Sequence, residues 1–120
     1  MKEDESPKRF DLEERTFAFA KRVCEFVKRL SKTIGNVEDS RQLVRSSGSV
    51  GANYIEANES FSKKDFVLRI KICRKEAKES RYWLRLIEAM EESLASERDL
   101  LAQEVQELMN IFGAIVRKSE

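Results

Sequence analysis

The sequence predicts an all-α fold, an antiparallel up-down-up-down bundle of four helices. Three observations lead to this prediction. Apolar residues recur at three- and four-residue spacings along most of the chain. The chain holds only one proline and four glycines, and 41% of its residues are apolar while 38% are charged, a balance typical of long helices with a solvated face. A chain of 120 residues forms one domain, which we assign to residues 11–117, with residues 1–10 as a flexible arm.

The first two helices are expected over residues 11–33 and 37–58. Asp11 opens the first one in the arrangement of a capping box, and apolar residues follow at helical spacing. Gly35 stands where a helix tends to end in a residue that tolerates positive φ, and Asn36 can cap the second helix. Such short connections make consecutive helices antiparallel.

The third and fourth helices are expected over residues 62–95 and 97–116. Each opens with an S-x-x-D sequence, in which the serine side chain caps the first turn. Phe61 and Phe66 hold the two positions of a hydrophobic staple at the start of the third helix. Neither proline nor glycine interrupts this helix, so we expect it to be continuous.

The expected third helix carries two separate apolar stripes. The first falls within an arc of roughly 100° and would face the core; it comprises Phe66, Ile70, Cys73, Ala77, Leu84 and Ile87. The second is centred roughly 120° away and comprises Leu68, Ile72, Trp83 and Met90. A second apolar stripe with a tryptophan usually marks an interface, unless the N-terminal arm or a neighbouring helix covers it. We therefore expect a homo-oligomer that uses the second stripe.

Positive charge is concentrated on another face of the same helix, which we call the basic stripe. Residues 63–85 include nine basic and three acidic residues, whereas the chain from residue 86 onward includes three basic and eight acidic ones. The net charge of +1 therefore hides a strong separation of charge. The basic stripe comprises Lys64, Lys71, Arg74, Lys75, Lys78, Arg81 and Arg85.

Two interpretations of the basic stripe stay open. It can bind the phosphate backbone of RNA or DNA, and its repetition around an oligomer would add avidity. Only Tyr82 accompanies it as an aromatic residue, so recognition of backbone and shape is favoured over base stacking. Alternatively, the basic stripe docks onto the acidic fourth helix of the same or an adjacent chain. The protein would then be an interaction scaffold that does not bind nucleic acid.

The sequence disfavours an enzyme, a cofactor and a metal site. Histidine, the commonest general base and transition-metal ligand, is absent. Pairs of glutamates at helical spacing lack the histidine of a di-iron bundle site, and no nucleophile motif accompanies them. Cys24 and Cys73 lie far apart with no CxxC, so we expect reduced thiols in a cytoplasmic protein. Neither a signal peptide nor a membrane-spanning stretch is predicted.

A run of small residues over 45–53 places Gly48 and Gly51 inside the expected second helix. Each interior glycine costs about 1 kcal/mol relative to alanine, so another interaction must offset that cost. The run lacks the G-x-x-x-x-G-K-[ST] pattern of a phosphate-binding loop, and its flanks are helical. We expect instead that Trp83 or a phenylalanine from a neighbouring helix packs closely against this backbone.

Three segments carry a resemblance to a known family: Q-L-V-R-S-S-G-S-V-G-A-N-Y-I-E-A-N-E (42–59), F-S-K-K-D-F (61–66) and K-E-A-K-E-S-R-Y-W-L (75–84). With these segments the chain resembles the bacterial 23S rRNA intervening sequence proteins, also labelled ribosomal protein S23, over residues 10–116. The most specific part is R-x-x-x-S-x-x-x-N-x-x-E at Arg45, Ser49, Asn53 and Glu56.

The resemblance implies a left-handed bundle that assembles into a ring-like homopentamer, in agreement with the second apolar stripe. The family is also similar to the accessory variability determinants of diversity-generating retroelements, which bind nucleic acid and a reverse transcriptase. By this similarity a nucleic-acid-processing protein would be a partner, and nucleic acid would contact Lys71, Arg74, Lys78, Arg81 and Arg85. We therefore expect a non-enzymatic, cytoplasmic accessory protein, linked to rRNA intervening sequences, that binds RNA or DNA.

Overall fold

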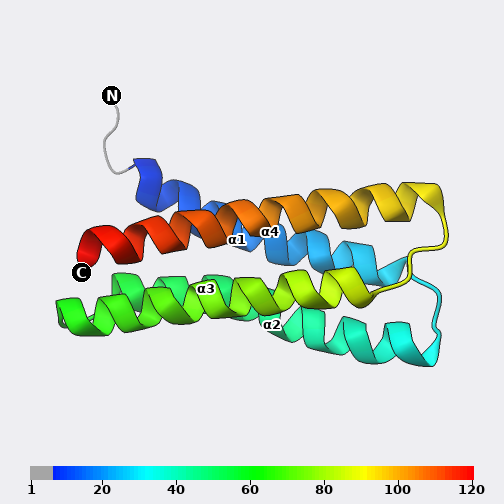
Figure 1. Cartoon of the computed structure of the whole chain (residues 1–120), viewed down its shortest axis with the longest axis horizontal. Coiled ribbons are helices and arrows are strands. Elements are labelled where there is room, and N and C mark those ends of the chain that lie inside the picture. The colour runs from blue at the N-terminus through cyan, green and yellow to red at the C-terminus, as the bar shows by residue number, and fades with distance from the viewer. Residues whose placement is uncertain (1–6) are drawn as a thin grey trace.

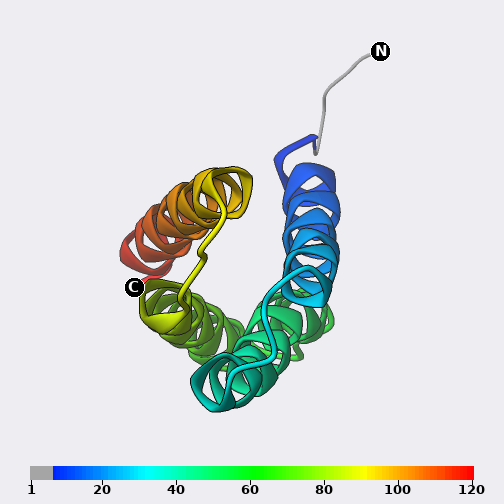
Figure 2. The ribbon, with the colours of Figure 1, turned by 90° about the vertical axis from the view of Figure 1, so that its right-hand side faces the viewer.

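Four helices follow one another along the described chain, in a computed structural model that covers residues 7–120, with side chains from residue 12 onward. They are α1 (Pro7–Lys28), α2 (Ile34–Asn58), α3 (Lys63–Leu86) and α4 (Glu92–Ser119). Each helix packs antiparallel to the next, and α1 meets α4 through a smaller contact (Figure 1, Figure 2). The predicted all-α up-down bundle is confirmed, whereas its handedness and its oligomeric state stay predictions.

The first helix begins and ends earlier than expected. It starts at Pro7, before Asp11, because a proline fits the first turn, where its missing N–H is not needed. Gly35 lies in the first turn of α2 and does not end α1. Thr33 caps α2, since its hydroxyl accepts a hydrogen bond from the Asn36 backbone N–H at 3.0 Å. Of the expected flexible arm, the first six residues lie outside the described residues and the last four are helical.

At the start of α3 the predicted cap is present, but the predicted staple is wrong. The Ser62 hydroxyl accepts a hydrogen bond from the Asp65 backbone N–H at 3.0 Å. Phe66 packs against the core, whereas Phe61 is fully exposed and so cannot staple the helix to it. Phe61 instead adds to the apolar surface of the molecule.

A loop over residues 87–91 divides the segment that we expected to form one continuous helix. α3 ends at Leu86, and Ile87 adopts extended backbone with a ψ of 133°. The buried Asn36 side chain donates to the Glu88 carbonyl at 3.0 Å and accepts from the Glu88 N–H at 3.1 Å. Hydrogen bonds from a residue distant in sequence thus hold the loop, which has no proline or glycine to predict it. α4 begins at Glu92, so Ser96 lies inside this helix and is not its cap.

The core runs along the inner faces of all four helices, where the largest fully buried side chains include Phe19, Phe26, Leu43, Leu101 and Phe112. The predicted core stripe of α3 is confirmed. Its members from Ile70 to Ile87 are buried, and Phe66 is half-buried against them. No helix in the described range is both long enough and apolar enough to span a membrane.

Candidate nucleic-acid interface

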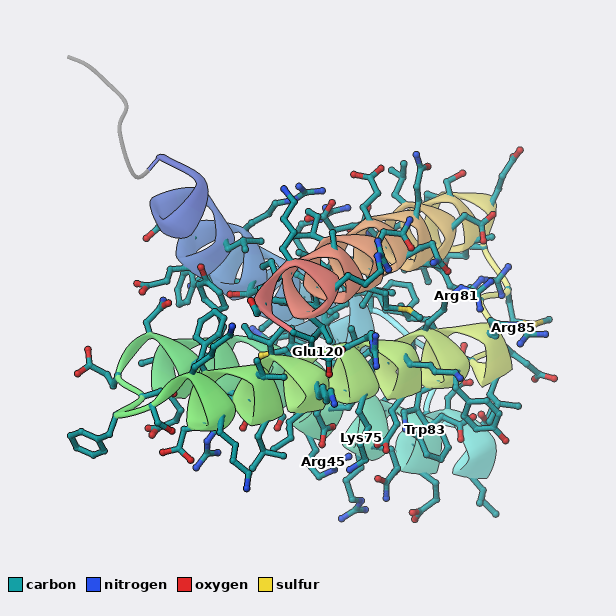
Figure 3. All side chains as sticks on the ribbon, turned by 60° about the vertical axis from the view of Figure 1, so that its left-hand side comes forward. Arg45, Lys75, Arg81, Trp83, Arg85 and Glu120 are labelled. Carbon is teal, nitrogen blue, oxygen red and sulfur yellow. The ribbon has the colours of Figure 1, made fainter. Side chains whose placement is uncertain are left out.

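The basic stripe lies on the outer side of α3, where Lys64, Lys71, Arg74, Lys75, Lys78 and Arg85 are exposed and Arg81 is half-buried. Figure 3 shows Arg81 and Arg85 on the side of α3 that faces α4, and Lys75 on the side that faces α2. Lys71 forms an ion pair with Glu120 at 3.0 Å. The other six side chains of the basic stripe form no ion pair with any residue from 12 to 120.

Three acidic residues of α4 pair with α1 and not with the basic stripe. Arg15 donates to both carboxylate oxygens of Glu104, at 2.8 and 2.9 Å, and to Glu107 at 2.7 Å. The hydrogen bond to Glu104 is the main reason why the pKa of Arg15 lies above its ordinary value. Arg22 pairs with Glu97 at 3.4 Å. The fourth helix therefore uses its acidic side to hold α1, which leaves the positive charge of α3 largely uncompensated within the chain.

Two acidic residues of α3 form ion pairs with α2, on another side of the helix. Arg45 of α2 reaches Glu76 at 3.3 Å and Glu79 at 3.0 Å, and the Glu76 side chain is almost fully buried. Close by, the hydroxyls of Ser46 and Ser80 are hydrogen-bonded at 2.8 Å in the buried seam between α2 and α3. These contacts fix the rotation of α3 about its axis, and with it the direction in which the basic stripe points.

A buried glycine of α4 brings one further basic residue to the basic stripe. A Cβ atom added at Gly113 would lie 3.4 Å from Nη1 of Arg117 and 3.8 Å from Nη1 of Arg74. Arg117 thus stands beside the basic stripe although it belongs to another helix. Sequence reasoning missed it because the periodicity of α3 alone says nothing about the neighbouring helix. The one signal in the sequence was Gly113, a glycine inside an amphipathic helix.

A hollow of about 760 Å³ lies where the start of α3 meets the end of α4. Its walls include Lys64 and Lys71 of the basic stripe, together with Lys63, Asp65, Leu68 and Glu120. The basic stripe thus ends in a recess that is lined by both lysines and acidic residues. The described residues contain no group of three or more acidic residues or cysteines that could hold a metal ion.

Comparison with known proteins places the chain in a family. The model of the 23S rRNA-intervening sequence protein family matches residues 8–114. The chain belongs to this family. A solved structure of a protein of unknown function from the S23 ribosomal protein family, from Bacteroides thetaiotaomicron VPI-5482, is similar, with a TM-score of 0.75 and 28% identity over 87% of this chain and 96% of that chain. No curated protein matches the sequence.

In this member of the 23S rRNA-intervening sequence protein family, three of the four motif residues lie at the seam between α2 and α3. Arg45 binds the two glutamates of α3, as described above. The Asn53 amide donates to the Ser49 carbonyl at 2.9 Å and to its hydroxyl at 3.1 Å, and the Asn53 carbonyl oxygen accepts from Arg69 of α3 at 3.0 Å. Glu56 is exposed, and its carboxylate has no polar partner in the described part of the chain. Three of the four motif residues therefore position the helix that carries the basic stripe.

The second apolar stripe of this family member is only partly exposed. Leu68 is 56% exposed, and Met90 is 81% exposed in the loop after α3. Ile72 and Trp83 are half-buried, and Trp83 packs against the core on the α2 side (Figure 3). The Trp83 indole Nε1 is buried without a hydrogen-bond partner among the described residues, which is uncommon for a buried donor.

An apolar face of α2, which sequence reasoning missed, adds to this surface. Its exposed members are Ile34, Val37, Val44 and Ile55, and they recur at helical spacing. Gly48 belongs to the same face and has open space where a side chain would stand. Gly51, in contrast, contacts α1, since a Cβ atom there would lie 3.0 Å from Oγ1 of Thr16. The expected close packing of a neighbouring helix is therefore present at Gly51, but Thr16 of α1 makes the contact, and the expected approach of Trp83 or a phenylalanine is wrong.

Proposed function

We propose that the protein is a non-enzymatic, cytoplasmic accessory protein that binds RNA or DNA through the basic stripe, by contacts to the phosphate backbone. The observation that supports this proposal most directly is that six of its seven side chains have no acidic partner among residues 12–120, while α1 and α2 occupy acidic residues of α4 and α3. When unpaired lysine and arginine side chains neutralise phosphates, the counterions condensed on the nucleic acid are released, and this release favours binding. The family description adds a link to 23S rRNA intervening sequences.

Recognition would be directed at backbone and shape. Tyr82, the aromatic residue that accompanies the basic stripe on α3, packs edge-on against Trp83 with ring centroids 5.1 Å apart, so a single and partly covered ring stands beside seven basic side chains. Stacking platforms for single strands need aromatic faces that are free to receive bases. From Lys64 to Arg85 the basic stripe extends about 32 Å at a rise of 1.5 Å per residue. That length corresponds to about nine nucleotides of one strand at 3.4 Å each.

Titration of a labelled 20-nucleotide RNA and a 20-base-pair DNA between 50 and 200 mM salt tests the proposal. The triple variant Arg74→Glu, Lys78→Glu, Arg81→Glu is expected to lose binding at least tenfold and to show a salt dependence weaker by about two to three units in the slope of log K against log salt. The matched control Lys21→Glu, Lys32→Glu, Arg41→Glu changes the net charge equally at exposed positions of α1, α2 and the loop between them. It should bind nearly as the wild type does. Equal binding by both triple variants, or no binding by the wild type, would contradict the proposal.

Self-association is a second proposal, supported by the exposed apolar surface of α2 and α3. We infer that copies of the chain assemble through the α2 face and the second apolar stripe, in a ring-like homo-oligomer such as a pentamer. Gly48 is an exposed glycine in the middle of α2, where glycine costs about 1 kcal/mol relative to alanine. No atom of the described residues lies within 4 Å of the point where its Cβ would stand. Such a glycine is expected where the backbone of a partner chain approaches closely. Repetition of the basic stripe in such an assembly would raise avidity for a long polyanion.

A protein-binding scaffold without nucleic-acid affinity is the alternative. The ion pair between Lys71 and Glu120 is the one contact in the described residues by which α4 neutralises part of the basic stripe. If this mode of pairing extended between adjacent chains, basic stripes would meet acidic residues and not phosphates. The salt titration separates the two functions, because the scaffold predicts no salt-sensitive binding to either nucleic acid.

A further inference from the structure

Two arginine side chains from different helices converge over Gly113. The point where a Cβ atom would stand lies within 3.8 Å of Nη1 of both Arg74 and Arg117. Both guanidinium groups therefore lie at van der Waals distance from the same point on α4. Both arginines are exposed on the outer side of the bundle, so a ligand could reach them from solvent.

Neither guanidinium group has a compensating partner in the described part of the chain. Arg74 and Arg117 form no hydrogen bond and no ion pair there. The nearest acidic side chain in sequence to Arg117 is Glu120, which is held by Lys71 at 3.0 Å. Two like charges close to one point repel each other, and an anion between them would relieve that repulsion.

We propose that Arg74 and Arg117 together form a binding site for one phosphate group, where α3 and α4 lie side by side at Gly113. Guanidinium groups suit this ligand because each offers a planar fork of N–H donors that matches two phosphate oxygens. The inference rests on the proposed function for the source of the phosphate, a nucleic-acid backbone. It goes further in adding a residue of α4 to the phosphate-binding surface, so that the nucleic acid would contact both α3 and α4.

The effect of Arg117 on binding tests this site. Arg117→Gln is expected to weaken binding of the 20-nucleotide RNA or the 20-base-pair DNA about five- to tenfold and to lower the salt slope by about one unit. Arg117→Lys keeps the charge but loses the fork, so it should recover only part of the affinity. The matched control is Lys118→Gln, an exposed neighbour with the same change in charge, which should alter binding less than twofold.

A double-mutant cycle then asks whether the two arginines act on one ligand group. If they share a phosphate, Arg74→Gln and Arg117→Gln together should weaken binding less than the product of the two single effects. Multiplicative effects would overturn the shared site. If Arg117→Gln binds as Lys118→Gln does while the triple variant of the basic stripe loses binding, the shared site of Arg74 and Arg117 is wrong and the proposed function stands.

Inorganic phosphate is the probe for the other source of the same ligand chemistry. Thermal unfolding of the wild type and of Arg117→Gln, with and without 20 mM phosphate at constant ionic strength, measures whether the free ion binds. A stabilisation of the wild type that Arg117→Gln lacks, combined with unchanged nucleic-acid binding, would overturn the assignment to a nucleic-acid backbone. Loss of nucleic-acid binding in Arg117→Gln, with or without this stabilisation, supports it.

Discussion

Burial in the core changes the acidity of the Cys73 thiol. Its side chain is fully buried on the core stripe of α3. Burial deprives the thiolate of hydration, and this raises the pKa of Cys73 from 9.0 to about 12. Cys24 on α1 is half-buried and is also a free thiol. Because the thiolate is the reactive form, Cys73 acts as a small apolar residue in the folded protein and not as a nucleophile.

This raised pKa predicts a loss of stability at alkaline pH. Below pH 9 the thiol is protonated in both the folded and the unfolded state, so it contributes no pH dependence. Between pH 9 and about 12 the unfolded chain releases the proton while the folded protein retains it, so the free energy of unfolding falls by about 1.4 kcal/mol per pH unit from this group.

Urea unfolding at pH 8, 9.5 and 10.5 measures this fall in the wild type and in Cys73→Ala. The variant should be less stable at pH 8, because it leaves a small cavity in the core. The difference in stability between the two proteins should then narrow as the pH rises. Parallel pH profiles for wild type and Cys73→Ala would show that the thiol is not protected by burial.

At the scale of the helices, the two glycines of α2 have opposite surroundings. Gly48 faces open space, so an alanine there meets no atom within 4 Å. An alanine at Gly51 would lie 3.0 Å from Oγ1 and 3.3 Å from Cβ of Thr16. Thr16 cannot easily turn aside, because its hydroxyl donates to the Leu12 carbonyl at 2.8 Å in a buried position. The same substitution should therefore have opposite effects one turn apart.

Gly48→Ala is expected to stabilise the folded chain by up to about 1 kcal/mol through helix propensity. Gly51→Ala should lose about 1 kcal/mol, since overpacking against Thr16 costs about 1–3 kcal/mol and exceeds the gain in propensity. Thermal unfolding followed by circular dichroism checks both, at low protein concentration so that self-association does not contribute. The double variant Thr16→Ala, Gly51→Ala should recover part of the loss. If Gly51→Ala instead stabilised the protein, α1 would have to move away from α2 at this contact.

The inner faces of the helices could be predicted from sequence, but several helix ends could not. Ile70, Cys73 and Leu84 share one arc of α3, and a helical wheel finds such a stripe without knowledge of its neighbours. The end of α3 depends on Asn36, which lies more than fifty residues away and binds both the N–H and the carbonyl of Glu88. No local pattern contains that information. Ser62, whose cap is entirely local, was predicted correctly.

The same distinction applies to the candidate site. The seven members of the basic stripe follow from their spacing along one helix, so their common face was predictable. The pairing of Arg15 with Glu104 and the position of Arg117 beside Arg74 depend on how helices pack side by side. The apolar face of α2 was missed for another reason. Its valines and isoleucines are separated by buried positions, and sequence alone does not say which of two apolar faces points inward.

At the scale of the whole molecule, one part of the basic stripe lies apart from the exposed apolar side chains. Arg81 faces α4 and Arg74 lies beside Gly113 of that helix, whereas Lys64 and Lys71 share a hollow with the exposed Leu68. Self-association through the α2 face and the second apolar stripe would leave the side toward α4, with Arg74 and Arg81, open. Assembly and nucleic-acid binding on that side are therefore compatible in one molecule.

Light scattering tests the assembly directly. The double variant Ile55→Asp, Leu68→Asp replaces two exposed apolar side chains near the contact between Asn53 and Arg69, and it should shift the measured mass toward the monomer. Helicity should stay largely unchanged, because neither side chain is buried in the chain itself. Leu100→Asp is the control, a substitution at a similarly exposed leucine of α4. An unchanged mass in the double variant would exclude this surface as the interface.

The uncompensated charge on one side of α3 also gives the molecule an electric dipole across the bundle. With a net charge of +1, the protein at a distance is almost neutral to a polyanion. At separations near the Debye length of about 8 Å, however, the field of the polyanion would rotate the molecule until α3 faces it. Orientation would thus precede contact, and fewer encounters would be lost to the wrong face. A ring of copies with their basic stripes on one side would add these dipoles, so the assembly would be steered more strongly than its total charge suggests.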